Sequence, residues 1–242
     1  LARRALEEIH PGYTDYASEL RLNRLWQDLD AHASEGTTEE ELYLALVRIV
    51  AEIRCDHTKI ELSKRAVAER DSEPVYLPFR FKVFDGRMFV DAPGQTGLSR
   101  GAEILTLDGI PASIRLQDVA DLISVDGYTD YVRWETVEAS SEELGSGFDH
   151  YDPILRPDDA SVSVTVQALD GRESSHTFER LTYPEFRAIT SEARRRNFSD
   201  PDAVTVRDLD EKTAYLSVNP IVNYRTPVDP VTVFEPIFRE FK

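Results

Sequence analysis

The sequence predicts an α+β fold, and two changes of pattern along the chain carry that prediction. Apolar residues follow the three-and-four spacing of helices through residues 1–70, whereas from about residue 74 they alternate with a period of two. Asp-Gly dipeptides, which are typical of tight hairpin turns, separate the alternating segments. Of the 242 residues, 41% are hydrophobic, so the chain has enough apolar material for a core and for roughly one to two domains.

The first 70 residues predict a helical bundle. A first helix at residues 1–9 is expected to stop at His10-Pro11-Gly12, because proline cannot continue a helix. A second helix is expected over residues 13–32. A third carries apolar residues from Leu42 to Ile53, with Thr37 or Thr38 as its N-cap and Glu40 or Glu41 completing a capping box. The end of this third helix delivers His57.

The rest of the chain is predicted to be rich in β-structure. Asp85-Gly86 and Asp108-Gly109 have the composition of hairpin turns, and residues 124–160 are rich in Gly, Ser, Asp and Pro, which favours an irregular insertion. Strands are expected at 75–84, 87–90, 102–107, 161–167, from 172 to near 181, 204–206 and 213–218, and helices at 114–123, 183–196 and 231–242.

Charge and composition exclude several classes of protein. A formal net charge of −17 argues against nucleic acid as a partner, because phosphate binding needs clustered Lys and Arg. A single cysteine excludes a disulfide framework and a cysteine-rich metal site. No apolar run approaches the roughly 20 residues that a membrane span needs. The sequence contains no dinucleotide-binding or phosphate-loop motif, so no cofactor is expected. No spacing of His, Asp and Glu matches a zinc motif, so no metal is expected.

Three segments, taken in order, resemble one family. Ala51-Glu-Ile-Arg-Cys-Asp-His-Thr58 resembles the helix-end Asp-Gly-His-Thr motif of tail-specific serine peptidases and their tricorn-like relatives, although Cys55-Asp56 stands where Asp-Gly is usual. Residues 97–109 resemble the PDZ segment in which a loop glycine leads into a Glu-Ile-Leu strand and an Asp-Gly turn. Residues 213–220 resemble the strand that opens the peptidase core.

The resemblance implies an organisation and a reaction. It implies a helical cap over 1–70, a PDZ-like module with an insertion over 71–185, and the start of an α/β peptidase core over 200–242. The nucleophilic serine of the family lies in the core, beyond the residue that corresponds to Lys242. The chain is therefore expected to be an N-terminal fragment of a serine endopeptidase that is inactive alone and whose substrate is a peptide or protein.

His57 is the candidate catalytic residue. Imidazole titrates near neutral pH and can take a proton from a serine hydroxyl, and the resemblance implies that a histidine of the cap serves as that base in tricorn-like members. Two alternatives stay open: a downstream lysine as the base, and a histidine that merely caps a helix C-terminus. Asp56 and Thr58 are candidates to orient the ring.

The PDZ-like module implies a second function, namely binding of peptides without chemistry, and a homologous scaffold that has lost catalysis is a further alternative. Such modules add an extended peptide to a sheet edge and hold its terminal carboxylate on loop amides. Gly97, Leu98 and Gly101 are the candidate substrate-binding residues. Relatives of this group are commonly exported, so an exported protein is expected, with the cytoplasm as the alternative. The oligomeric state is left open.

Two other candidate nucleophiles are set aside. Cys55 and His57 are two positions apart, and on a helix such side chains diverge, so a buried and inert cysteine is expected. Ser99 lies in a Gly-x-Ser-x-Gly sequence, but a nucleophile elbow needs a helix directly after the serine, and here a strand is predicted.

Overall fold

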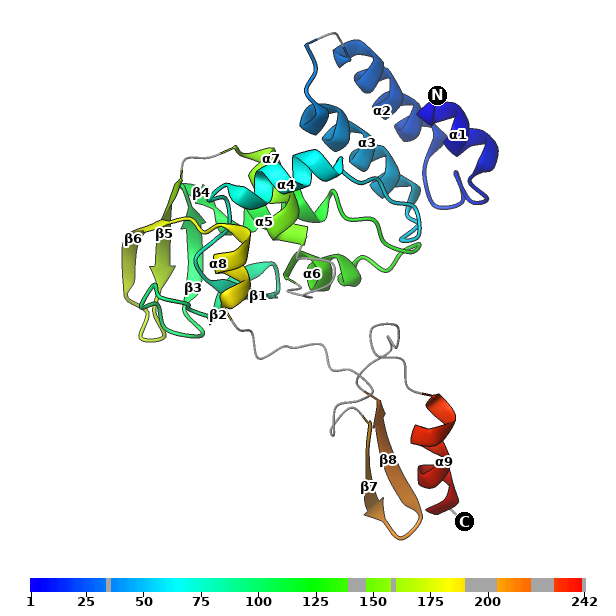
Figure 1. Cartoon of the computed structure of the whole chain (residues 1–242), viewed down its shortest axis with the longest axis vertical. Helices are drawn as coiled ribbons and strands as arrows, with labels where there is room; N and C mark the ends of the chain where they lie inside the picture. Colours follow the sequence, from blue (N-terminus) through cyan, green and yellow to red (C-terminus); the bar gives the residue numbers. More distant parts are fainter. Residues whose placement is uncertain (34–35, 139–146, 158–159, 190–203, 219–228, 241–242) are drawn as a thin grey trace. The chain divides into compact units, whose positions relative to one another are not determined.

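The structure is a computed structural model that describes the chain except for residues 34–35, 139–146, 158–159, 190–203, 219–228 and 241–242. Contacts between residues divide it into two compact units, Leu1–Glu192 and Ala193–Lys242. The first unit holds several helices and the larger sheet, and the second holds a hairpin and a helix (Figure 1). The mixed α+β class is confirmed, whereas the division into cap, PDZ-like module and peptidase core stays a prediction.

The N-terminal part of the first unit is helical, as expected. Thr38 caps its third helix with the predicted capping box: its hydroxyl accepts from the Glu41 amide at 3.2 Å, and the Glu41 carboxylate accepts from the Thr38 amide at 2.9 Å. Such caps stabilise a helix by about 1 kcal/mol. The helices are α1 (Ala2–Ile9), α2 (Glu19–His32), α3 (Glu39–Ile53) and α4 (Lys64–Ser72).

The predicted start of the second helix is wrong by six residues. Ser18 is the N-cap of α2, and the preceding residues pack against the helix instead of extending it. The Tyr13 hydroxyl accepts a hydrogen bond from the Trp26 indole at 2.8 Å, and Ala17 is buried beside Leu22. Tertiary packing of Tyr13 thus overrides the helical spacing of the local sequence.

The larger sheet is antiparallel, with strand order β1-β2-β3-β5-β6 and the short β4 paired to β3. Both predicted turns are confirmed: Asp85 and Gly86 have φ of 51° and 71°, and Asp108 and Gly109 have 52° and 76°. Two successive positive φ values are typical of the hairpin turn that Asp-Gly favours. The strands are β1 (Arg80–Phe84), β2 (Arg87–Ala92), β3 (Glu103–Leu107), β4 (Ile110–Pro111), β5 (Ser161–Gln167) and β6 (Glu173–Glu179).

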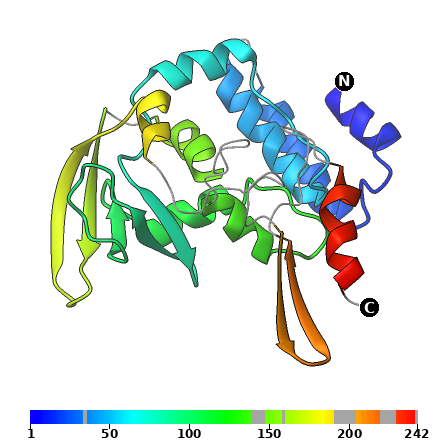
Figure 2. The ribbon, with the colours of Figure 1, turned by 60° about the horizontal axis from the view of Figure 1, so that its bottom comes forward.

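Helices cover one face of this sheet, and in Figure 2 they lie between the strands and the N-terminal helices. They are α5 (Ala112–Ala120), α6 (Tyr131–Glu138), α7 (Gly147–Leu155) and, near the end of β6, α8 (Tyr183–Ala188). The expectation of irregular structure over 124–160 is therefore wrong for 131–138 and 147–155, which are helical, while 139–146 and 158–159 lie outside the described residues. Phe148 on α7 is 1% exposed and packs edge-on against Phe81 of β1, so burial of an aromatic side chain stabilises a helix that even contains Pro153.

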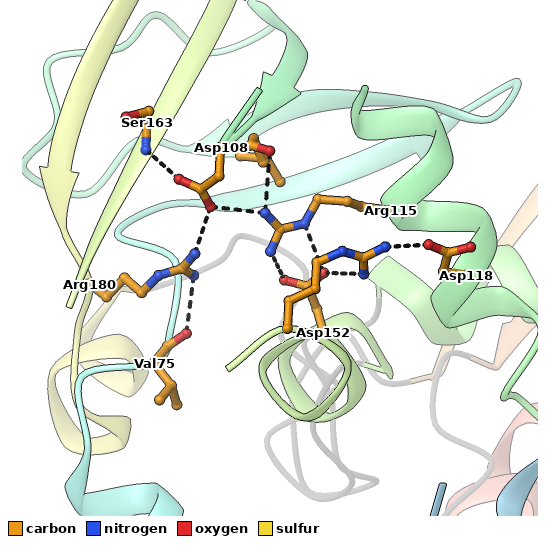
Figure 3. Close-up of polar contacts among 9 residues, drawn as sticks. Val75, Asp108, Arg115, Asp118, Asp152, Ser163 and Arg180 are labelled. Atoms are coloured by element: carbon orange, nitrogen blue, oxygen red, sulfur yellow. Dashed lines mark hydrogen bonds and ion pairs between the residues drawn. The ribbon is translucent and has the colours of Figure 1, made fainter. Parts of the chain in front are cut away.

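A network of buried charges joins the sheet to α5 and α7 (Figure 3). Arg115 of α5 is fully buried and donates to both Asp108 and Asp152. Asp108 also accepts from Arg180 at 2.9 Å and from the Ser163 amide at 2.8 Å. Arg115 and Asp152 are buried with charged partners, and Asp108, whose side chain is 27% exposed, links Arg115 to the sheet, so the network holds the turn after β3 against both helices.

The second unit contains the predicted strand pair and the last helix. Strands β7 (Val204–Asp210) and β8 (Thr213–Val218) form an antiparallel hairpin, and α9 spans Pro230–Glu240. The expected helix at 183–196 is confirmed only as α8, because Ile189 is already extended and the positions from 190 onward lie outside the described residues. Among the described helices, none combines the length and hydropathy needed to cross a bilayer.

Candidate functional site

His57 lies in a tight turn that follows α3. The helix ends at Ile53 because Arg54 adopts a left-handed backbone, with φ of 62° and ψ of 47°. The Thr58 amide then donates to the Cys55 carbonyl at 3.1 Å, which closes the turn. A non-glycine residue in this conformation costs about 1 kcal/mol or more, so other interactions must hold the turn in place.

Those interactions come from the segment between α5 and α6. The Arg54 guanidinium donates to the Gly127 carbonyl at 2.5 Å and to the Asp130 carboxylate at 2.6 Å, while the Gly127 amide donates to the Arg54 carbonyl at 3.0 Å. The Ser124 hydroxyl donates to the Cys55 carbonyl at 2.8 Å. Loop 54–58 and loop 124–130 are thus joined through backbone groups, which determines the positions of their side chains relative to each other.

Asp126 is the carboxylate that this junction brings to His57. One of its oxygens accepts from the Asp56 amide at 2.8 Å and lies 3.9 Å from Nδ1 of His57. The His57 side chain is 87% exposed and that of Asp126 is 61% exposed. The pair is therefore open to solvent, with the carboxylate held in place by the backbone and the imidazole ring projecting outward.

Cys55 is closer to His57 than helical geometry predicts. The donor atoms of Cys55, His57 and Asp126 all lie within 4.8 Å of one another. The expectation that the side chains of Cys55 and His57 diverge is wrong, because both residues lie beyond the end of α3, in the turn. Of the two predicted orienting residues, Asp56 contributes its amide to Asp126, while the Thr58 hydroxyl is bonded to Nε2 of His10 at 2.9 Å.

A shallow cleft of about 590 Å³ adjoins this turn. His10 at its rim accepts the Gly12 amide on Nδ1 at 3.1 Å, so its other nitrogen carries the proton that is donated to Thr58. The residues that line the cleft include His10, Tyr16, Arg54, Cys55, Asp126 and Tyr128. The sequence pattern singles out His57 and Cys55 but not Asp126, whose only local signal is another Asp-Gly pair.

The predicted substrate-binding residues lie elsewhere, in the loop between β2 and β3. The Gly101 amide donates to the Val90 carbonyl at 2.8 Å, and the Leu98 amide is bonded to the Thr96 hydroxyl at 3.2 Å. Gly97 has a φ of 74°, which its lack of a side chain allows. Two of the three candidate amides therefore donate within the chain, and their role in peptide binding stays a prediction.

A second hollow of about 470 Å³ lies beside the first part of that loop. Gly94 and Thr96 form one wall, and the end of β6 and helix α8 form the other, through Phe178, Leu181 and Ile189. Strand β6 is at the end of the sheet order and is largely exposed. The end of an edge strand therefore lines the hollow.

His150 is half-buried on α7. Burial, together with the neighbouring Arg70 guanidinium, lowers the pKa of His150 to about 3. Arg70 donates to Nδ1 at 2.9 Å, and Nε2 lies 2.7 Å from the Tyr43 hydroxyl. Because Nδ1 must accept, the neutral ring donates through Nε2 to Tyr43, so both nitrogens of His150 are used in holding α3, α4 and α7 together.

Comparison with known proteins gives a likeness of structure only. No family model matches the sequence, and no curated protein matches it. Solved structures that resemble it are of CPAF, a chlamydial serine protease of the tail-specific family. A CPAF variant matches with 14% identity and a TM-score of 0.44 over 66% of this chain and 27% of that chain.

Mature CPAF complexed with lactacystin matches with 13% identity and a TM-score of 0.41. That match covers 73% of this chain and 34% of the CPAF chain, so the chain spans about a third of the length of the proteins it matches. At this identity and TM-score the likeness does not assign an activity.

Proposed function

We propose that this chain is the N-terminal portion of a serine endopeptidase of the tail-specific or tricorn-like group, in which His57 is the general base. The observation that carries the proposal is the exposed His57 ring with a carboxylate 3.9 Å from its Nδ1. A base must reach its substrate proton and must be oriented by a third group. His57 and Asp126 supply both of these features.

The two ring nitrogens have different roles in this proposal. Nδ1 faces Asp126, so Nε2 is the nitrogen that takes the proton from a serine hydroxyl and later returns it to the leaving amine. Asp126 stabilises the imidazolium that forms. The present 3.9 Å is longer than a hydrogen bond, and such contacts are often long before substrate binds and tighten in the reactive complex.

The remaining catalytic groups are proposed to come from the peptidase core. The nucleophilic serine and the oxyanion hole are placed beyond Lys242, in the α/β unit whose first elements are β7, β8 and α9. Residues 1–70 would then be the cap that delivers the base, and residues 71–185 a PDZ-like module. The proposed substrate is a peptide or protein, and the proposed location is outside the cytoplasm.

The test uses the natural polypeptide from its source. Its intact mass is measured first, because a core requires a mass well above that of the 242 residues. The polypeptide and two of its variants are then labelled with a fluorophosphonate. The variants are His57→Ala and, as a matched control, His176→Ala at an exposed position of β6. Loss of labelling by about a hundredfold or more in His57→Ala alone is expected. Equal labelling of both variants would refute the role of His57.

A second candidate function is peptide binding through the hollow beside β6. A peptide added to the exposed edge of β6 would run toward loop 94–96, where amides could hold its carboxylate. Peptides with a free C-terminus are expected to bind saturably, and their amidated forms are not. Phe178→Ala should weaken binding, while Leu169→Ala, an exposed apolar residue at the β5–β6 turn, should not. A flat binding curve for a diverse peptide pool would refute peptide binding through this hollow.

A further inference from the structure

Three side chains with metal-binding donor atoms converge at the end of α3. Sγ of Cys55, one ring nitrogen of His57 and one carboxylate oxygen of Asp126 lie within 4.8 Å of one another. The three come from two loops that are far apart in the sequence and are joined by hydrogen bonds between side chains of one loop and backbone groups of the other. The cluster therefore depends on the fold rather than on a short sequence motif.

The distances are close to those of a tetrahedral site. Zinc binds sulfur at about 2.3 Å and nitrogen or oxygen at about 2.0 Å, which puts two ligands of one ion roughly 3.3–3.8 Å apart. His57 and Asp126 are already at 3.9 Å. The side chain of His57 is largely exposed, so rotations of its two torsions can adjust its distance to the other two ligands at little cost.

We propose that Cys55, His57 and Asp126 form a binding site for zinc or another divalent cation that prefers sulfur and nitrogen, with a fourth position open toward the cleft of His10 and Tyr128. The mixture of thiolate, imidazole and carboxylate selects such ions over Mg²⁺ and Ca²⁺, which take oxygen ligands. Three protein ligands and one open position are the arrangement of catalytic rather than purely structural zinc sites.

The surroundings support the ligands without competing for the ion. The Asp56 amide fixes one Asp126 oxygen at 2.8 Å, and the Ser124 hydroxyl holds the carbonyl of Cys55. Outer contacts of this kind orient the ligands of metal sites. His10 is bonded through both ring nitrogens, to Gly12 and Thr58, so water is the expected fourth ligand.

Metal binding and base catalysis would exclude each other at His57. An imidazole that gives one nitrogen to a metal keeps its proton on the other, so it cannot accept a proton from a serine. An ion at this site would therefore inhibit the proposed peptidase reversibly. The site itself does not rest on the proposed function, because binding is measured on the chain without any activity.

The experiment is a titration of the tag-free 242-residue chain with Co²⁺, followed by competition with Zn²⁺. Cobalt is used because a thiolate ligand gives an intense near-ultraviolet charge-transfer band. One ion per chain is expected, with the band present and displaced by zinc. Cys55→Ser should abolish the band, and His57→Ala and Asp126→Asn should each weaken binding by at least about tenfold, as even outer contacts do in known sites.

Asp126→Asn keeps an oxygen that can accept the Asp56 amide, so it removes the charged ligand while preserving the loop. His176→Ala is the control for an exposed histidine outside the cluster, and far-ultraviolet circular dichroism checks that each variant is folded. The proposal is overturned if the band is absent, if His57→Ala and Asp126→Asn bind as tightly as the parent, or if His176→Ala weakens binding equally. A failed peptidase assay would leave the cobalt result unaffected.

Discussion

The buried cluster around Arg115 and the site around His57 both contain carboxylates, and they differ in how their charges are satisfied. At the centre of the first unit, Arg115 is fully buried between Asp108 and Asp152, and each group has several partners. At the end of α3, His57 and Asp126 are mostly exposed, and their closest approach is 3.9 Å. Buried and saturated groups hold a fold together, whereas exposed and unsaturated ones remain available to a ligand.

The largest expected effect comes from breaking the buried cluster. Arg115→Met removes the cation and leaves Asp152, which is 1% exposed, in a poorly compensated state. Loss of one partner from a buried pair costs about 3–5 kcal/mol, and urea unfolding followed by circular dichroism measures it. The control is Arg172→Met at the exposed Arg172–Asp170 pair, where less than about 1 kcal/mol is expected.

The double variant Arg115→Met, Asp152→Leu separates charge from packing. It removes both buried charges and should recover part of the loss, because the residual penalty of an unpaired carboxylate disappears. If Arg115→Met costs no more than Arg172→Met, the buried cluster is not a structural element, and the contrast with the His57 site has no basis.

A smaller effect is expected from pH, and it comes from His150, which lies on α7 like Asp152 of the buried cluster. An unfolded histidine titrates near pH 6.5, while His150 in the folded chain has a pKa of about 3. Between about pH 3 and pH 6.5 the unfolded state binds one more proton than the folded state. The contribution of His150 to the free energy of unfolding is therefore fully present above about pH 6.5 and is lost as the pH falls below that value. The slope due to this group is about 1.4 kcal/mol per pH unit.

The measurement compares urea unfolding between pH 7 and pH 5, above the range in which most carboxylates titrate. His150→Gln can still accept from Arg70 and donate to Tyr43 but has no titration, so its slope should be flatter than that of the parent by about one proton. A parental slope in His150→Gln would show that His150 does not titrate differently on folding.

Features that depend on adjacent residues could be predicted from the sequence, whereas features that depend on distant partners could not. The Asp-Gly turns and the Thr38 capping box need only adjacent residues, and both predictions were confirmed. Helices α6 and α7 were missed, because their stability comes from burial of residues such as Phe148 against the sheet and not from local propensity.

The candidate site likewise combines a residue that local sequence predicts with one that only the fold brings near. His57 could be singled out from its position at a helix end, but Asp126 meets the turn through a hydrogen bond between residues 70 positions apart. Cys55 was misplaced because the left-handed Arg54 ends the helix at a position where glycine would have been the usual signal. A contact that depends on two loops and on an unusual backbone angle has no signature in a single sequence.

The smallest expected effect is the most informative about the site. His57→Ala should change the free energy of unfolding by less than about 0.5 kcal/mol, since an exposed side chain without a close partner contributes little. Asp126→Ala should cost more, about 1 kcal/mol, because the Asp56 amide loses its acceptor, and Asp126→Asn should restore that loss. Urea unfolding at pH 7 measures all three. If His57→Ala instead costs more than 1 kcal/mol, the ring is part of the helix end, and its exposure no longer argues for either catalysis or metal binding.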